Sequence, residues 1–203
     1  MSTALTRPAA RLAVLASGRG SHLRNLYKAC SQGVLDAKIG LVVSNNVRSS
    51  AWHFAASEDL PHWFCDTSNN TKSSAVDQAL AACLIEHRID WVITAGYLKK
   101  IGPTTLDAFP NRIINIHPAL LPNYGGAGMY GQNVHRAVLA AKERQSGATV
   151  HYVTARYDEG AIIAQNHVTI TQGMTPDSLA DTILKIEHPL LVQALQGLLT
   201  HHD

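Results

Sequence analysis

Apolar runs of strand length alternate with stretches of helical periodicity through most of this chain, and no other feature restricts its fold as strongly. The stretches between the runs place apolar side chains three or four residues apart, as Leu23, Leu26 and Cys30 do, which is the spacing of a helix packed on a core. Strands that alternate with helices form a parallel sheet with helices on both faces. The sequence therefore predicts an α/β fold built on an open, mostly parallel, twisted, Rossmann-like sheet. Its strands are expected at residues 11–16, 39–43, 62–65, 91–95 and 113–117.

The pattern changes toward the C-terminus. Two apolar stretches, 148–154 and 161–170, follow each other with only a short turn between them, so they are predicted to pair as antiparallel strands. Thr175 and Pro176 then suit a helix start, because threonine is a favourable N-cap residue and proline fits the first helical position. That helix is predicted to reach about Leu199.

A stretch rich in proline and glycine precedes these strands. Residues 120–132 hold Pro122 and four glycines and are predicted to form a long loop, which in a compact domain is usually functional or disordered. This loop is a candidate lid over a binding site. Asn133 is predicted to cap the following helix, which should run from Val134 to about Arg144.

Length and composition indicate one globular domain. The chain has 203 residues, of which 46% are hydrophobic, and we expect a single domain over 1–203 with a disordered tail at 1–10. A net charge of only +2 gives no electrostatic basis for binding nucleic acid or a membrane surface. The N-terminal segment lacks the apolar core of a secretory signal, and the 3 cysteines form no CxxC pair. We therefore expect a cytoplasmic protein with reduced cysteines.

Asn115 and His117 end the strand predicted at 113–117, just before Pro118. Side chains two residues apart in an extended backbone point to the same side, and Pro118 keeps His117 extended. A side-chain amide beside a titratable ring suits acyl transfer, since one group can stabilise an oxyanion while the other moves a proton. The alternative is that both residues merely cap a strand.

A glycine-rich loop, Ser17-Gly-Arg-Gly-Ser21, lies between the first predicted strand and the first predicted helix. Backbone N–H groups at such a helix start bind anions, and glycine lets a phosphate approach closely. The loop has neither the lysine of a P-loop nor the third glycine of a dinucleotide fingerprint. It therefore favours a monophosphate, and the alternative is a plain tight turn.

These motifs belong to one ordered set. In this order they closely resemble the phosphoribosylglycinamide formyltransferase family of purine synthesis, over about Leu12 to at least His188. The resemblance implies transfer of a formyl group from 10-formyltetrahydrofolate, the co-substrate, to the amine of glycinamide ribonucleotide, by a monomer or homodimer and without a metal. The blocks that carry it are S-G-R-G-S at 17–21, A-G-Y-L-K-K-I at 95–101, N-I-H-P-A-L-L-P at 115–122, G-A-T-V-H-Y-V at 147–153 and Y-D-E-G-A-I-I-A-Q at 157–165.

The resemblance also assigns catalytic residues. Asn115 and His117 would stabilise the oxyanion that forms when the amine attacks the formyl carbon. Asp158 would keep His117 protonated, because a nearby carboxylate favours the charged ring, and it could order a water that moves the proton.

Binding residues follow from the same matches. Gly20, Ser21 and His22 would hold the phosphate, and Glu187 would contact the ribonucleotide, although it could also be a solvated helix residue. Residues assigned to the folate are Asn115 together with Lys72, Leu98, Lys99, Lys100, Ile101 and Thr154. Leu98 and Ile101 could instead be ordinary core, and Lys100 could reach the acidic tail of the folate or face water.

Departures from the family pattern keep other functions open. His22 replaces the usual asparagine after the phosphate loop, and Lys99-Lys100 replaces a commoner arginine-plus-aliphatic pair. A sugar-nucleotide N-formyltransferase and a non-catalytic folate- or nucleotide-binding module are therefore alternatives. Methionyl-tRNA formyltransferases and formyl-folate hydrolases use similar motifs but carry additional domains, which the sequence does not predict here.

Overall fold

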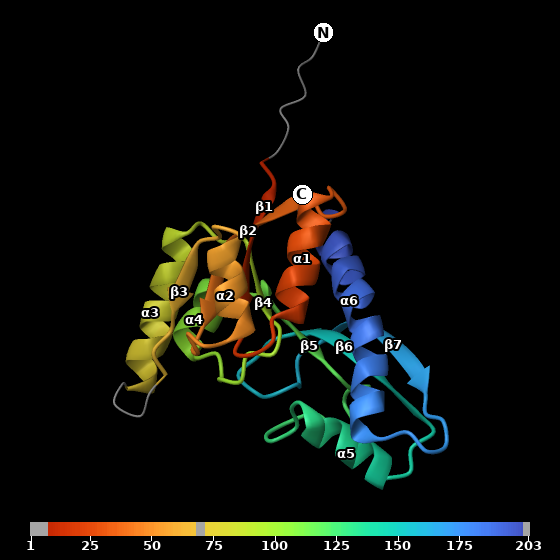
Figure 1. Cartoon of the computed structure of the whole chain (residues 1–203). Coiled ribbons are helices and arrows are strands. Elements are labelled where there is room, and N and C mark those ends of the chain that lie inside the picture. The colour runs from red at the N-terminus through yellow and green to blue at the C-terminus, as the bar shows by residue number, and fades with distance from the viewer. Residues whose placement is uncertain (1–7, 68–71, 201–203) are drawn as a thin grey trace.

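The computed structural model describes residues 8–67 and 72–200 and has one twisted seven-stranded sheet in the order β3-β2-β1-β4-β5-β6-β7 (Figure 1). The pairs from β3 to β5 are parallel, whereas β5–β6 and β6–β7 are antiparallel. The strands are β1 (Ala10–Leu15), β2 (Ala37–Ser44), β3 (His62–Phe64), β4 (Trp91–Thr94), β5 (Ile113–His117), β6 (Gln145–Tyr152) and β7 (Ile162–Thr169).

Helices cover both faces of this sheet. One face packs against α1, α2, α5 and α6, and the other against α3 and α4 (Figure 1). The helices are α1 (Ser21–Ser31), α2 (Ser50–Ser57), α3 (Ser73–Glu86), α4 (Pro103–Ala108), α5 (Gln132–Ala140) and α6 (Pro176–Thr200).

Two hydrophobic cores result because successive residues of a strand face opposite sides. In β1, Leu12 and Val14 enter the core beneath α1 and α6, whereas Ala13 and Leu15 enter the core beneath α3. All four are fully buried. A strand buried on both faces reads as a continuous apolar run, which is why β1 and β4 carry no polar alternation.

The predicted fold class and the antiparallel pairing near the C-terminus are confirmed. Pro176 begins α6 as expected, and the Thr175 hydroxyl accepts a hydrogen bond from the Ser178 N–H. Of the predicted tail at 1–10, residues 1–7 lie outside the described residues, and Ala10 already belongs to β1. The predicted tail therefore extends too far, because its last residue belongs to a strand.

The helix after the glycine-rich loop differs from the prediction. α5 starts at Gln132 and ends at Ala140, with Gly131 rather than Asn133 as its N-cap residue. The Asn133 side chain instead donates to the carbonyl of Gly128, inside the loop. Over residues 8–67 and 72–200, no helix combines the length and apolar character needed to cross a bilayer.

Candidate active site

A cleft of about 640 Å³ opens at the C-terminal ends of β1, β4 and β5. The sheet order reverses beside β1, because β1 pairs with β2 on one side and β4 on the other. Open α/β sheets bind ligands at such switch points, where the loops after neighbouring strands diverge. Here the walls include the loop before α1, the segment after β4, the long loop before α5 and part of α6.

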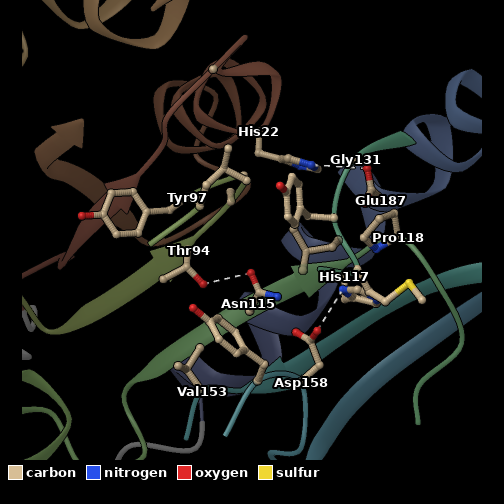
Figure 2. Close-up of a pocket in the computed structure, with 18 of the residues that line it drawn as sticks. His22, Thr94, Tyr97, Asn115, His117, Pro118, Gly131, Val153, Asp158 and Glu187 are labelled. Carbon is tan, nitrogen blue, oxygen red and sulfur yellow. Dashed lines mark hydrogen bonds and ion pairs between the residues drawn. The ribbon is translucent and has the colours of Figure 1, made fainter. Parts of the chain in front are cut away.

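Asn115 and His117 both line this cleft from β5, as their spacing predicts (Figure 2). The Asn115 amide is held between two groups: Oδ1 accepts from the Thr94 hydroxyl at 2.9 Å, and Nδ2 lies 3.1 Å from His151 Nε2. His117 is buried, and its Nε2 donates to the Tyr124 carbonyl at 2.8 Å. These contacts fix both side chains before any substrate binds.

Asp158 reaches the same pair from the loop between β6 and β7. It has a positive φ of 57°, a conformation that aspartate tolerates better than most residues. Its carboxylate lies 3.6 Å from His117 Nδ1 and 3.5 Å from His151 Nε2, and it accepts the Gly126 N–H at 2.9 Å. The three predicted catalytic side chains therefore converge (Figure 2). His151 contacts both Asn115 and Asp158 and is a fourth member of the group.

Burial and charge act in opposite directions on the pKa values here. Burial lowers the pKa of His117 below its ordinary value of 6.5, although the Asp158 carboxylate and the Tyr124 carbonyl oppose this. Burial alone would raise the pKa of Asp158, but contacts with His151, His117 and the Gly126 N–H outweigh it and lower that pKa below 3.8. Asp158 thus raises the pKa of His117, as expected of a nearby carboxylate, but in the free protein burial outweighs this effect. Asp158 itself stays ionised.

The glycine-rich loop lies at one end of the cleft and leads directly into α1. Gly20 is the N-cap residue, with φ of 69° and no side chain to cap the first N–H groups. A Cβ at Gly20 would lie 2.8 Å from Ala51 Cα in α2, so the position also requires glycine for packing. The first-turn N–H groups of α1 have no intrahelical acceptor and can bind an anion in the cleft.

His22 and Glu187 meet beside this loop, from α1 and α6. His22 Nε2 lies 3.4 Å from Glu187 Oε2, and both residues are buried (Figure 2). The His22 ring also packs edge-on against His188 with 5.0 Å between centroids. Among the residues that the structure describes, none offers a hydrogen-bond partner to the buried His22 Nδ1. Glu187 is not the solvated helix residue of the alternative prediction.

The residues predicted to contact the folate divide into two groups. Six of them line the cleft: Asn115, Leu98, Lys99, Lys100, Ile101 and Thr154. Leu98 is 56% exposed and is therefore not core, whereas Ile101 is buried in the second core and also lines the cleft. Lys100 Nζ lies 5.7 Å from the ring centroid of Tyr157. Lys72 precedes α3 as its exposed N-cap residue and is not part of the lining.

Sequence reasoning missed several residues that build the site. They are Thr94, His151, His135 and the backbone groups of Tyr124 and Gly126. His151 falls within the G-A-T-V-H-Y-V block, and the β5–β6 register places it opposite Asn115, so a correct pairing of the two strands would have found it. Thr94 ends an apolar run without any motif of its own, and only the β4–β5 register, which places it opposite Asn115, connects it with the site.

The described part of the chain contains no group of three or more histidine, cysteine, aspartate or glutamate side chains able to hold a metal ion. The side chains that converge in the cleft are instead amide, imidazole and carboxylate groups engaged with one another. Such a set can donate hydrogen bonds to an oxyanion, move a proton and hold a neutral or cationic amine.

Comparison with known proteins agrees with this chemistry. The family model described as formyl transferase matches residues 10–195. The chloroplastic phosphoribosylglycinamide formyltransferase of Arabidopsis thaliana is 39% identical over 186 residues, which are 91% of this chain and 64% of that protein. This chain thus spans less than two thirds of the length of that relative.

Two bacterial proteins match over most of their own length. The phosphoribosylglycinamide formyltransferase of Bacillus subtilis is 32% identical over 191 residues, covering 93% of this chain and 95% of that one. The crystal structure of glycinamide ribonucleotide transformylase 1 from Symbiobacterium toebii has a TM-score of 0.89 at 32% identity, covering 96% of this chain and 90% of that one. A family match over nearly the whole described chain, at a cleft with this chemistry, means that the chain belongs to the formyl transferase family.

Proposed function

We propose that this protein transfers the formyl group of 10-formyltetrahydrofolate to the amine of glycinamide ribonucleotide, a step of purine biosynthesis and one-carbon metabolism. The observation that carries the proposal is the convergence of Asn115, His117 and Asp158 in one cleft that ends at an anion-binding helix start. The names of the relatives from Bacillus subtilis and Arabidopsis thaliana support this choice of acceptor.

Catalysis begins when the neutral amine attacks the formyl carbon and the formyl oxygen becomes an oxyanion. The Asn115 amide donates a hydrogen bond to that oxygen, since its second Nδ2 hydrogen remains available beside the contact with His151. His117 faces the same region. The lowered pKa of His117 leaves the ring neutral at first, and the developing negative charge then raises its proton affinity.

Asp158 assists the transfer of the amine proton. The amine loses one proton as the new C–N bond forms, and the folate nitrogen gains one as its C–N bond breaks, so the protons balance without a metal. Because its pKa is lowered, Asp158 stays ionised and can accept a hydrogen bond from the attacking amine or from an ordered water. The Gly126 N–H holds the carboxylate in place during this transfer.

The acceptor lies toward α1 and α6 in this proposal. Its phosphate binds the N–H groups at the start of α1, around Gly20 and Ser21, and His22 adds a donor there. Glu187 accepts hydrogen bonds from the ribose hydroxyls. The folate lies on the other side of Asn115, against Leu98, Ile101 and Thr154, and Lys99 and Lys100 face its acidic tail.

We also propose a single formyltransferase domain that acts in the cytoplasm as a monomer or homodimer. One sheet runs through the described residues and joins all seven strands, which supports the single domain.

Steady-state assays with 10-formyltetrahydrofolate and three acceptors test the function. The expected result is rapid formylation of glycinamide ribonucleotide, monitored by folate absorbance, and little turnover with an amino-sugar nucleotide or with water alone. Preference for the amino-sugar nucleotide would replace the proposal with a sugar formyltransferase. Tight binding of folate without turnover of any acceptor would make the chain a binding module.

A further inference from the structure

Thr94 is a buried polar residue in the candidate active site to which neither the sequence motifs nor the proposed mechanism gives a role. It is the last residue of β4, only 6% exposed, and lines the cleft beside Asn115 (Figure 2). Parallel pairing of β4 with β5 places Thr94 directly opposite Asn115. A hydroxyl at this point therefore meets the amide of the neighbouring strand.

The hydrogen bonds around Asn115 define which way its amide faces. Thr94 and His151 lie at opposite ends of this amide: Asn115 Oδ1, which can only accept, is 2.9 Å from the Thr94 hydroxyl, and Asn115 Nδ2 is 3.1 Å from His151 Nε2. The Thr94 hydroxyl is therefore the donor to Asn115 Oδ1. The amide is held at both ends.

The torsion that orients an asparagine amide is soft, because it joins sp³ and sp² carbons. Without the Thr94 hydroxyl, Asn115 Oδ1 would lose the only side-chain donor that the described structure gives it. The amide could then rotate and turn its free N–H away from the formyl oxygen. Donors to an oxyanion act through preorganisation, so a small rotation costs rate.

We infer that Thr94 is a positioning residue, whose hydroxyl fixes the Asn115 amide in the orientation that stabilises the oxyanion. The inference rests on the formyl transfer proposed above. The hydroxyl also lies 3.3 Å from the Ile114 carbonyl, but it has a single proton, and the Asn115 contact is the shorter one. If Thr94 had only a structural role, its hydroxyl would serve the Ile114 carbonyl alone, and its loss would lower the stability of the fold without lowering kcat.

Thr94→Val tests the inference, because valine keeps the shape of threonine and removes the hydroxyl. We expect kcat for formyl transfer to fall about tenfold, the factor given by loss of one hydrogen bond of about 1.4 kcal/mol. KM for both substrates should change less than kcat, and Thr94→Ser should restore most of the rate. Thr105→Val is the matched control: it removes a buried threonine hydroxyl that bonds Asp77 at 2.6 Å, outside the cleft lining, and should lower stability without lowering kcat.

A double-mutant cycle with Asn115→Ala separates action through Asn115 from any other effect. If Thr94 acts by orienting Asn115, adding Thr94→Val to Asn115→Ala should cost no further rate. Equal losses in both backgrounds would overturn the inference, as would a normal kcat in Thr94→Val. If the wild-type protein is active, either of these variant results overturns only the role of Thr94 and leaves the proposed function standing. A wild-type protein unable to formylate the acceptor would overturn both.

Discussion

At the scale of single residues, burial and neighbouring charges shift the pKa values of His117 and Asp158, and these shifts define the part each can take in proton transfer. Asp158 is ionised because His151, His117 and Gly126 outweigh its burial, while His117 is neutral because burial outweighs Asp158. The buried pair therefore starts as one negative charge beside a neutral ring. That arrangement attracts an amine and leaves room for one more proton, which is the requirement for moving a proton between two nitrogens.

Removing either group should reduce turnover strongly. We expect His117→Ala and Asp158→Asn each to lower kcat by about 10²- to 10⁴-fold, the usual contribution of a proton-transfer group. Asparagine is the better change at Asp158, because it can still accept the Gly126 N–H and so preserves the loop. Circular dichroism and unfolding midpoints would verify the fold. A variant that is folded and retains near-normal kcat would remove that residue from the mechanism.

The pH dependence of the rate should follow the amine. An amine of this class has an ordinary pKa of about 8, so kcat/KM should fall below that pH as the amine becomes protonated. Asp158 should add no loss above about pH 4, because its pKa is lowered. Rate profiles from pH 5 to pH 9 would measure this. The acid limb should have the same midpoint in the slow Asp158→Asn variant, and a shifted midpoint would reassign that limb to the carboxylate.

At the scale of elements, the proposed phosphate binding and the packing of the loop before α1 both depend on Gly20. Gly20 faces α2 so closely that a side chain would displace Ala51, and its positive φ strains any other residue. Gly20→Ala should therefore lower stability by more than the roughly 1 kcal/mol cost of the left-handed conformation. It should also raise KM for the phosphorylated acceptor more than KM for the folate.

Gly33 offers a matched control for this prediction. Its φ of 70° is nearly the same, but an added Cβ would meet nothing within 4 Å, and Gly33 lies outside the lining of the cleft. Thermal unfolding of Gly33→Ala measures the conformational strain alone. If Gly20→Ala were as stable as Gly33→Ala, the close packing of Gly20 on Ala51 would be wrong. If Gly20→Ala raised only the folate KM, the assignment of this loop to the phosphate would be wrong.

Sequence patterns predicted these elements unequally. β5, α1 and the start of α6 follow from local patterns: an apolar strand before Pro118, helical spacing, and proline at the first helical position. The start of α5 does not follow from a local pattern, because Gly131 is its N-cap residue and Asn133 bonds within the preceding loop. Asn115 and His117 were predictable because two residues on one strand share a side. Thr94 and His151 depend on which strands pair and in which register, and that is a property of the whole sheet.

At the scale of the whole molecule, buried histidines link stability to pH. Burial lowers the pKa of His117, His135 and His188 below 6.5. The unfolded chain then binds protons more readily than the folded chain, so stability is full above about pH 6.5 and falls as the pH drops below it. Asp77 and Asp158 affect stability only at still lower pH. Burial alone would raise their pKa values, but hydrogen bonds and, for Asp158, the neighbouring histidines lower both pKa values below 3.8.

Urea unfolding at pH 8, 6.5 and 5.5 would test this linkage. We expect the midpoint to be highest at pH 8 and to decline at each step toward pH 5.5. His135→Gln should flatten the decline by removing one of the three rings. A midpoint that stayed constant or rose on acidification would mean that the histidines become protonated without cost in the folded state.

The end of the cleft proposed for the acceptor joins α1 to α6, because His22 from α1 meets Glu187 from α6. Bringing together segments so distant along a chain is entropically costly and happens late. While the protein is being synthesised, β1 and α1 leave the ribosome long before α6 exists. Under the proposed function, the nascent chain therefore carries its phosphate-binding loop early but cannot hold a ribonucleotide against Glu187 before α6 has been made and has docked beside α1.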